Sequence, residues 1–166
     1  AATIDPTLER ALVNVCVAAA SNIIYGGMRR GGSSLFSLDV TKISSHQLES
    51  ARIPKMNWEI NPTVSGFEEL GQTWSIPVLA QIKVNGVAKR VLVFGGGYDT
   101  KNDKDSELVA EKGSQIYMVD ALTGKLIWYA SHSSSGADLK LVDMKFSLPN
   151  KLEILDMNND GFIDYI

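Results

Sequence analysis

The chain has 166 residues, which is enough for one domain with a hydrophobic core. Hydrophobic residues make up 45% and charged residues 21% of the sequence, as in an ordinary soluble globular protein. The net charge of −3 argues against a nucleic-acid partner, and the longest apolar run, 15–20, is too short to cross a bilayer. The abrupt start at AATID and the apolar end at Ile166 suggest a piece of a longer protein, so the missing secretory signal says nothing about the parent.

Strand signals dominate from the N-terminus onward. Asp5-Pro6 could open a helix, but the alternating valines of VNVCV favour a strand from about Leu12, with Cys16 as a small buried side chain. Further apolar or alternating runs follow, separated by clusters of Gly, Asn, Asp and Ser. In chain order the predicted strands lie in LVNVCVA, NIIYGG, SLFSLDV, MNWEI, SIPVLAQIKV, RVLVFGG, SQIYMVD, KLIWYA and NKLEIL. The expected fold class is all-β.

The sequence also contains an internal repeat. SSLFSLDVT at 33–41 matches SQIYMVDALTG at 114–124, and each copy follows a glycine-rich strand end and precedes a short strand with a tryptophan. The aligned pairs are Phe36 with Tyr117, Leu38 with Val119, Asp39 with Asp120, and Trp58 with Trp128. A repeating four-stranded antiparallel unit is typical of a propeller blade, because one small sheet cannot bury both of its faces alone.

The repeat divides the chain into blades. We expect residues 1–166 to form part of a quinoprotein-like β-propeller, with blade one at about 12–60, blade two at about 73–130 and the start of blade three at about 144–166. The prediction is thus two four-stranded antiparallel blades plus the beginning of a third. Glycine-ended strands would lie inside and tryptophan strands outside. Open sheet edges pair readily, so we expect the chain to be capable of self-association.

The C-terminal stretch LEILDMNNDGFIDYI contains a loop rich in side-chain oxygens. It falls where the first strand of blade three would turn into its second, a place that blade two fills with the tight-turn pair Asn85-Gly86. Its pattern matches D-x-[DN]-x-[DN]-G, in which alternate oxygens converge on one Ca²⁺ and the glycine allows a sharp turn. The predicted metal ligands are Asp156, Asn158, Asp160, the backbone carbonyl of Phe162, and Asp164, with Gly161 at the turn.

Three alternatives apply to the same loop. An EF-hand would need flanking helices and a glutamate at its twelfth position, but KLEIL and IDYI favour strands, and that position lies beyond Ile166. A polar turn that never holds metal is the second alternative. The third is Mg²⁺, a poorer match because it prefers octahedral sites that retain several waters. We therefore predict Ca²⁺ as the cofactor.

Elsewhere no catalytic constellation emerges, and we do not expect an enzyme. The acidic stretch 99–107 lacks alternation and contains lysines, which favours a solvated loop. The triple glycine 95–97 has no helix after it, which favours close strand packing over a phosphate site. Residues 29–32, RRGG, favour an exposed turn, with a partner contact as the alternative. His46 and His132 each stand alone in polar loops.

Several motifs, taken in order, resemble the C-terminal propeller of PilY/PilC-type type IV pilus biogenesis factors. From about Tyr25 to Ile166 these are GMRRGGSSLFSLDVT, FEELGQTWSIPVL, VLVFGGGYD, GSQIYMVDALTGKLIW and LDMNNDGFIDYI. The resemblance implies a large secreted protein on the outer membrane, cell surface and pilus of a Gram-negative bacterium. It implies a role in pilus extension against retraction, hence in twitching motility, and in adhesion. Pilus subunits, minor pilins and a surface or host ligand would be partners, and the family's calcium loop maps onto the five ligands given above.

A second resemblance involves the same residues. VDALTGKLIW looks like the tryptophan-docking repeat of quinoprotein dehydrogenases, which implies packing roles for Asp120, Thr123, Gly124 and Trp128. Such an enzyme would need a quinone floor, a calcium ion beside the quinone and a catalytic carboxylate, for which the sequence gives no sign. Two further functions therefore stand beside pilus biogenesis: a non-catalytic envelope assembly scaffold and, less favoured, a quinoprotein dehydrogenase fragment.

Overall fold

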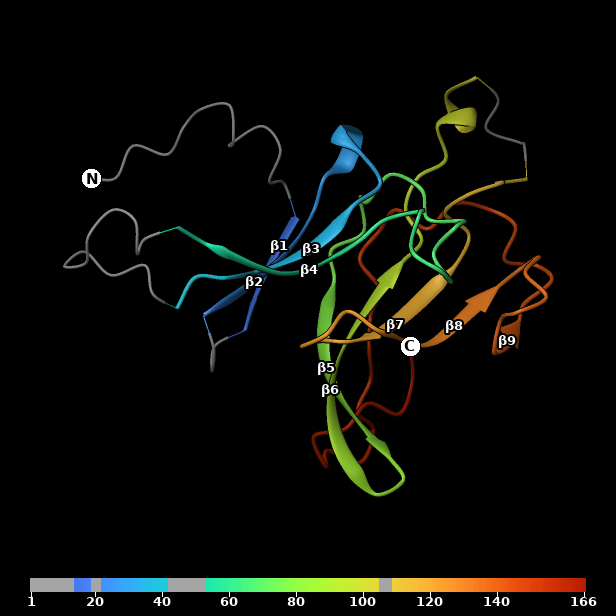
Figure 1. Cartoon of the computed structure of the whole chain (residues 1–166). Helices are drawn as coiled ribbons and strands as arrows, with labels where there is room; N and C mark the ends of the chain where they lie inside the picture. The colour runs from blue at the N-terminus through green and yellow to red at the C-terminus, as the bar shows by residue number, and fades with distance from the viewer. Residues whose placement is uncertain (1–13, 19–21, 42–52, 105–108) are drawn as a thin grey trace.

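The computed structural model describes residues 14–18, 22–41, 53–104 and 109–166, and the strands among them form two β-sheets (Figure 1). Within these ranges no α-helix occurs, which confirms the predicted all-β class. Among the same residues, none of the short helical turns is long and apolar enough to cross a membrane. Asp5-Pro6 and His46 lie outside the described residues.

The first sheet contains four strands in sequence order, each antiparallel to the next. They are β1 (Asn14–Ala18), β2 (Ile23–Gly27), β3 (Leu35–Asp39) and β4 (Lys55–Ile60). The strand at β1 confirms the interpretation of the valine-rich segment as β-structure, which its β-branched residues favour. The glycine-ended strand β2 lies inside the sheet, and Trp58 lies on the edge strand β4.

The second sheet contains five strands. They are β5 (Val78–Val84), β6 (Val87–Gly95), β7 (Ile116–Asp120), β8 (Leu126–Ser131) and β9 (Leu139–Lys140). Asn85 and Gly86 have φ of 52° and 79°, so both central residues of the β5–β6 turn are left-handed, as in the predicted tight hairpin. The short strand β9 runs parallel to β8, so this sheet departs from the predicted four antiparallel strands, and Trp128, on β8, does not lie on the outer strand as predicted.

The two copies of the repeat have matching strand registers. Trp58 lies opposite Ser37, and Trp128 lies opposite Met118, the residue aligned with Ser37. In both sheets the pairing shifts at the next step, between Ser37 and Leu38 and between Met118 and Val119. The repeat in the sequence therefore corresponds to a repeat of strand geometry that includes this irregularity.

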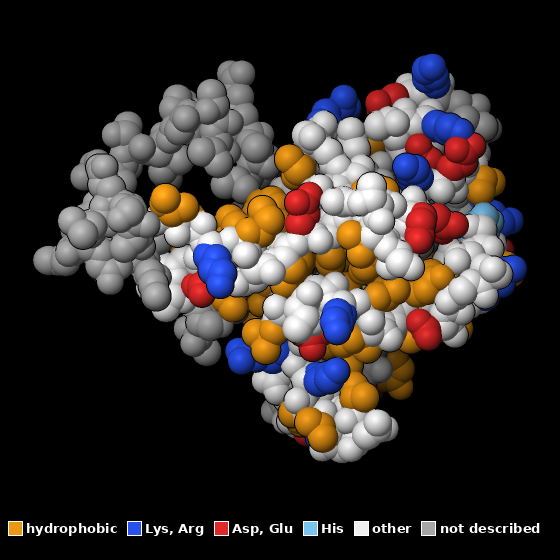
Figure 2. All heavy atoms as spheres, viewed as in Figure 1, with side chains coloured by type: hydrophobic (Ala, Val, Ile, Leu, Met, Phe, Trp, Pro, Cys, Tyr) orange, Lys and Arg blue, Asp and Glu red, His pale blue; other side chains and the backbone are white. Residues whose placement is uncertain are grey.

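The two sheets bury opposite faces of the repeated unit. In β3 the buried residues are Leu35 and Ser37, whereas in β7 they are Tyr117 and Val119, which align one residue later. Because successive strand residues point to opposite faces, the first sheet covers one face of the second. Their shared core contains Ile23, Tyr25, Leu35, Trp58, Ile60, Phe67, Leu70, Leu92, Phe94, Tyr117, Val119 and Ala121. Figure 2 shows hydrophobic side chains along the middle of the molecule, between groups of charged residues.

Trp58 makes the most specific contact between the sheets. Its side chain is 9% exposed, stacks on Tyr25 at 5.9 Å between ring centroids, and donates from Nε1 to the Ala121 carbonyl oxygen at 3.2 Å. The indole lies against Gly124, where a Cβ would be 2.7 Å from a ring carbon and φ is +70°. Asp120 holds this turn, because its Oδ1 accepts from the backbone nitrogens of Leu122 and Thr123. The packing role implied for Gly124 is thus present, with Trp58 as its partner.

The C-terminal segment covers the other face of the second sheet. Leu152, Ile154 and Ile163 pack against a buried cluster that includes Val91 and Val93 of β6. The strand predicted in NKLEIL is not formed: residues 144–166 contain no strand, and their β-pairing consists of isolated bridges, among them the antiparallel bridge between Leu155 and Tyr165. A third blade therefore stays a prediction.

Candidate metal site

The predicted calcium loop is an exposed turn on a fixed base. The bridge between Leu155 and Tyr165 closes it, with the Leu155 nitrogen donating to the Tyr165 oxygen at 2.9 Å. On its second side, the Ile163 nitrogen donates to the Gln81 oxygen of β5 at 3.0 Å. Asp156 is half-buried, whereas Asn158 and the other acidic residues of the loop are exposed. The second sheet thus holds the ends of the loop and leaves its centre open to solvent.

The side-chain oxygens of the loop fold back onto the loop's own backbone. Asp156 accepts from the Asp160 nitrogen at 3.2 Å and from the Gly161 nitrogen at 2.8 Å, one bond to each carboxylate oxygen. Asn158 Oδ1 accepts from the Asp160 nitrogen at 2.9 Å. Asp164 Oδ2 accepts from the Met157 nitrogen at 2.9 Å, which links the two ends of the loop. Each bond uses part of an oxygen's acceptor capacity and orients the carboxylate or amide that makes it.

Two residues turn the chain within the loop. Gly161 has φ of +86° and a Cβ there would meet nothing within 4 Å, so the position is restricted by backbone conformation alone. Asn159 adopts φ of 59°, a left-handed conformation that asparagine tolerates better than most residues. The glycine predicted to permit the sharp turn therefore has this role in the structure.

Lys83 of β5 is the cation nearest to the loop carboxylates. Its Nζ lies 3.4 Å from Asp160 Oδ2 and 4.1 Å from the centroid of the Phe162 ring. The Phe162 backbone N–H, which donates to Asp160 Oδ1 at 2.9 Å, is the largest influence holding the pKa of Asp160 below its usual value, and Lys83 adds to it. Sequence reasoning did not associate Lys83 with the loop, because the two lie 77 residues apart.

The donor chemistry of the loop fits Ca²⁺. All predicted ligands are oxygens, including three carboxylates, and hard oxygen ligands are what Ca²⁺ prefers. In the described part of the chain, no three His, Cys, Asp or Glu side chains lie close enough together to hold a metal ion. The structure thus brings the predicted residues into one turn and orients several of them, while the carboxylates themselves stay apart.

Asp99 corrects another prediction. It was expected in a solvated loop, but it is 5% exposed and precedes the 3-10 helix η3 (Thr100–Asp103). Its carboxylate accepts backbone N–H bonds from Lys101 at 3.0 Å, Glu111 at 2.9 Å and Lys112 at 3.1 Å. Burial by itself raises the pKa of Asp99, but these three N–H bonds outweigh it and the net pKa is lowered. Asp99 therefore fixes the backbone around η3 relative to residues 111–112.

Comparisons with known proteins place these features in a family. No protein-family model matches the chain. The type IV pilus biogenesis factor PilY1 of Pseudomonas aeruginosa strain PAO1 is 32% identical over 146 residues, covering 86% of this chain and 10% of that protein. A PilY1 homolog of Xylella fastidiosa strain Temecula1 is 26% identical over 148 residues, covering 87% of this chain and 9% of that protein. The chain therefore spans about a tenth of the length of these curated relatives.

A solved structure agrees in fold. The crystal structure of the Pseudomonas aeruginosa PilY1 C-terminal domain has a TM-score of 0.56 and 22% sequence identity to this chain. The match covers 92% of this chain and 26% of that domain structure. These relatives are named as biogenesis factors and carry no enzyme name. The chain is therefore a PilY1-type fragment whose fold matches part of the PilY1 C-terminal domain.

Proposed function

We propose that this chain is a calcium-binding part of a type IV pilus biogenesis factor and adhesin, which regulates pilus extension against retraction and attachment to surfaces. The names of the relatives support the pilus role, and the loop chemistry supports the calcium role. The proposal locates the protein on the outer membrane, cell surface and pilus of a Gram-negative bacterium. Its partners would be pilus subunits and minor pilins. We propose that the protein acts by binding and not by catalysis.

One observation carries the calcium proposal: the loop's polar side chains are already turned onto its backbone. Asp156, Asn158 and Asp164 each accept a backbone N–H from within the loop. An ion entering the loop would therefore meet oriented oxygens that retain unused lone pairs. Asp160 and the Phe162 carbonyl would complete the ligand set. A bound Ca²⁺ would supply charge neutralisation among three carboxylates, whose mutual repulsion otherwise opposes their approach.

The loop's attachment to the second sheet suggests how occupancy would reach the rest of the fold. Ile163 is hydrogen-bonded to Gln81, and it packs with Ile154 against the buried cluster of that sheet. Ordering of the loop would thus fix the surface around 156–164 relative to β5. Ion binding to the folded chain alone would stabilise it by about 2.7 kcal/mol at a hundredfold excess over the dissociation constant. We propose that calcium occupancy changes the contacts that this surface makes with other proteins.

Isothermal titration of the 166-residue chain with CaCl₂ tests the binding half. Asp156→Asn and Asp164→Asn each remove a charge from the loop, and Asp143→Asn removes an exposed carboxylate outside it. We expect the loop variants to lose calcium affinity and Asp143→Asn to retain it. Equal affinity in all four proteins would refute the assignment. Bacteria carrying Asp164→Asn in the corresponding full-length protein test the regulatory half, because normal piliation and retraction with the variant would contradict it.

A further inference from the structure

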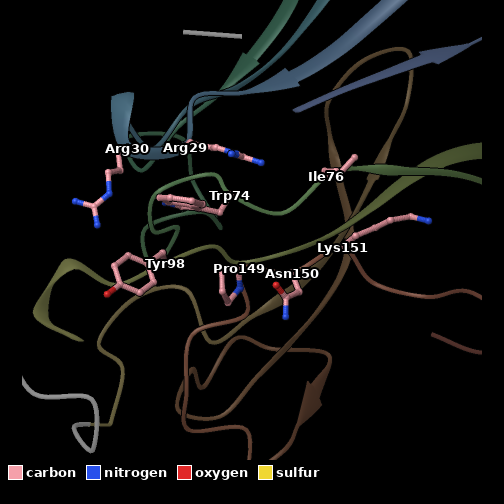
Figure 3. Close-up of a pocket in the computed structure, with 8 residues that line it drawn as sticks. All are labelled: Arg29, Arg30, Trp74, Ile76, Tyr98, Pro149, Asn150 and Lys151. Carbon is pink, nitrogen blue, oxygen red and sulfur yellow. The ribbon is translucent and has the colours of Figure 1, made fainter. Parts of the chain in front are cut away.

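A basic and aromatic pocket lies on the side of the molecule where both sheets meet the segment after β9. The cavity has a volume of about 460 Å³, within the range of small-ligand sites. Figure 3 shows Trp74 between the Arg29 side chain and Tyr98, with Pro149 and Asn150 on another wall. The pocket shares no residue with the calcium loop 156–164. It is therefore separate from the predicted metal site.

Arg29 is held in this pocket in an unusual conformation. It lies in the 3-10 helix η1 (Arg29–Gly31) with φ of 47°, a backbone state that costs a non-glycine residue free energy. Two bonds to Thr73 hold the segment in place: Met28 nitrogen to Thr73 Oγ1 at 2.8 Å and Arg29 nitrogen to the Thr73 oxygen at 3.2 Å. The Arg29 guanidinium carbon then lies 5.3 Å from the centroid of Trp74. Tertiary contacts thus fix this cation over an aromatic ring.

The Arg29 guanidinium also lacks an acceptor for a buried N–H. Its Nε is buried and has no hydrogen-bond partner among the described residues. A buried donor without an acceptor costs free energy unless a ligand or water supplies one. Arginine presents its N–H groups in a planar fork that matches a carboxylate. A carboxylate oxygen entering the pocket would supply the acceptor that this N–H lacks.

The other charges around the pocket agree with an anionic ligand. Arg30 and Lys151 also line it, and none of its lining residues is acidic. The salt bridges of these two side chains are exposed: Arg30 lies 3.9 Å from Asp103, and Lys151 lies 3.7 Å from Glu153. Exposed pairs of this kind are weak, so they leave both cations able to attract a second anion. The pocket thus combines three cations with an apolar wall formed by Ile76 and Pro149.

We propose that this pocket binds an acidic peptide segment, with a side-chain carboxylate on Arg29 and an adjacent apolar residue against Ile76 and Pro149. An isolated phosphate would leave the apolar wall of Ile76 and Pro149 without a partner. A sugar would need an open aromatic face, but Arg29 covers one face of Trp74, and Tyr98 meets that ring edge-on at 6.2 Å. An acidic residue beside an apolar one satisfies both parts of the pocket.

Two capped pentapeptides test the proposal: acetyl-Ala-Phe-Glu-Phe-Ala-amide and the same peptide with Gln in place of Glu. Binding to the 166-residue chain is followed by NMR, through the indole N–H signal of Trp74 assigned with Trp74→Phe. We expect the Glu peptide to bind about tenfold or more tightly than the Gln peptide, as for a charge-assisted hydrogen bond. Arg29→Gln should remove this preference, and Lys89→Gln, at an exposed lysine outside the pocket, should keep it.

Several results would overturn the proposal. Equal binding of the Glu and Gln peptides, or no binding of the Glu peptide at millimolar concentration, would do so. Galacturonic acid and inorganic phosphate serve as competing probes, and tighter binding of either would replace the peptide assignment. If Arg29→Gln fails to fold, Lys151→Gln provides the second test. Because Lys151 is exposed, that variant should fold and bind the Glu peptide severalfold more weakly, and unchanged binding would contradict the proposal.

Discussion

Replacing Trp58 with alanine should remove much of the free energy that holds the two sheets together. Complete burial of a tryptophan removes about 150–250 Å² from water. At roughly 25 cal/mol per Å² this area corresponds to about 4–6 kcal/mol, an upper estimate because unfolded chains already bury some surface. Since Trp58 is 9% exposed, nearly all of this contribution is at risk. We expect Trp58→Ala to lower the free energy of unfolding by about 3–5 kcal/mol.

Part of that loss belongs to one hydrogen bond, and a second variant isolates it. Trp58→Phe keeps an aromatic ring near Tyr25 but removes the N–H that reaches the buried Ala121 carbonyl. An unsatisfied buried acceptor costs about 1–3 kcal/mol, so the phenylalanine variant should lie between wild type and alanine. Trp128→Ala is the matched control, because Trp128 has the same place in the repeat but is only half-buried.

Urea unfolding of the 166-residue chain, followed by far-ultraviolet circular dichroism, measures all three variants. The expected order of destabilisation is Trp58→Ala first, then Trp58→Phe and Trp128→Ala with smaller losses. In thermal melts, the loss for Trp58→Ala corresponds to roughly 6–20 °C in a chain of this size. If Trp58→Ala and Trp128→Ala had equal effects, the buried contact with the turn at Gly124 would not be what joins the sheets.

Three further outcomes follow from the geometry. Asp99→Asn should lower the free energy of unfolding by about 1–3 kcal/mol at pH 7, because it weakens charge-assisted hydrogen bonds. Since folding lowers the pKa of Asp99, the carboxylate stabilises the fold above the ordinary pKa of 3.8, and this stabilisation is lost as the pH falls below that value. The urea midpoints of variant and wild type should therefore converge at low pH. Lys83→Met removes a cation 3.4 Å from Asp160, so it should raise the calcium affinity of the loop about two- to tenfold, with the largest effect at low salt. Calorimetry measures this affinity, and an unchanged value would exclude competition between Lys83 and the ion. Gly124→Ala should lower the free energy of unfolding in urea by more than about 2 kcal/mol, because backbone strain adds to a clash with Trp58. Gly161→Ala should lower it by about 1–2 kcal/mol, from backbone strain alone, because a Cβ there meets no other atom. Equal losses would show that the contact between residue 124 and Trp58 does not matter.

Local sequence patterns were sufficient to predict the features that depend on local chemistry. Apolar and alternating runs predicted strands β1 to β8, whereas NKLEIL, predicted in the same way, forms only an isolated bridge at Leu155. Asn85-Gly86 predicted the hairpin because only certain residues adopt two successive left-handed conformations. The repeat predicted equivalent positions for Trp58 and Trp128, and the structure gives them equivalent registers. The oxygen-rich loop was also predicted as a turn, since Gly161 and its flanking acids are local signals.

Features that depend on distant residues were not predicted. Asp99 was assigned to solvent because its neighbours are polar, but its carboxylate accepts hydrogen bonds from Glu111 and Lys112, which are 12 and 13 residues away in the sequence. The exposed turn predicted at 29–32 is present, since the 3-10 helix η1 has no buried residue, but the contact of Arg29 with Trp74, far along the chain, was not predicted. The addition of β9 beside β8 was missed because a two-residue parallel strand has no periodicity to detect.

The contact of Trp58 suggests a general rule for stacking these sheets. A tryptophan near the end of one repeat packs on the aspartate-capped turn of the next, at Gly124, and this relation joins opposite faces of the two copies. Trp128 holds the same place in the second copy, and residues 152–163 already cover the face on which it lies beside Met118. A further copy stacked in the same way would bring its own turn to Trp128. This arrangement is the one expected of the predicted propeller, in which repeated four-stranded units stack around one axis.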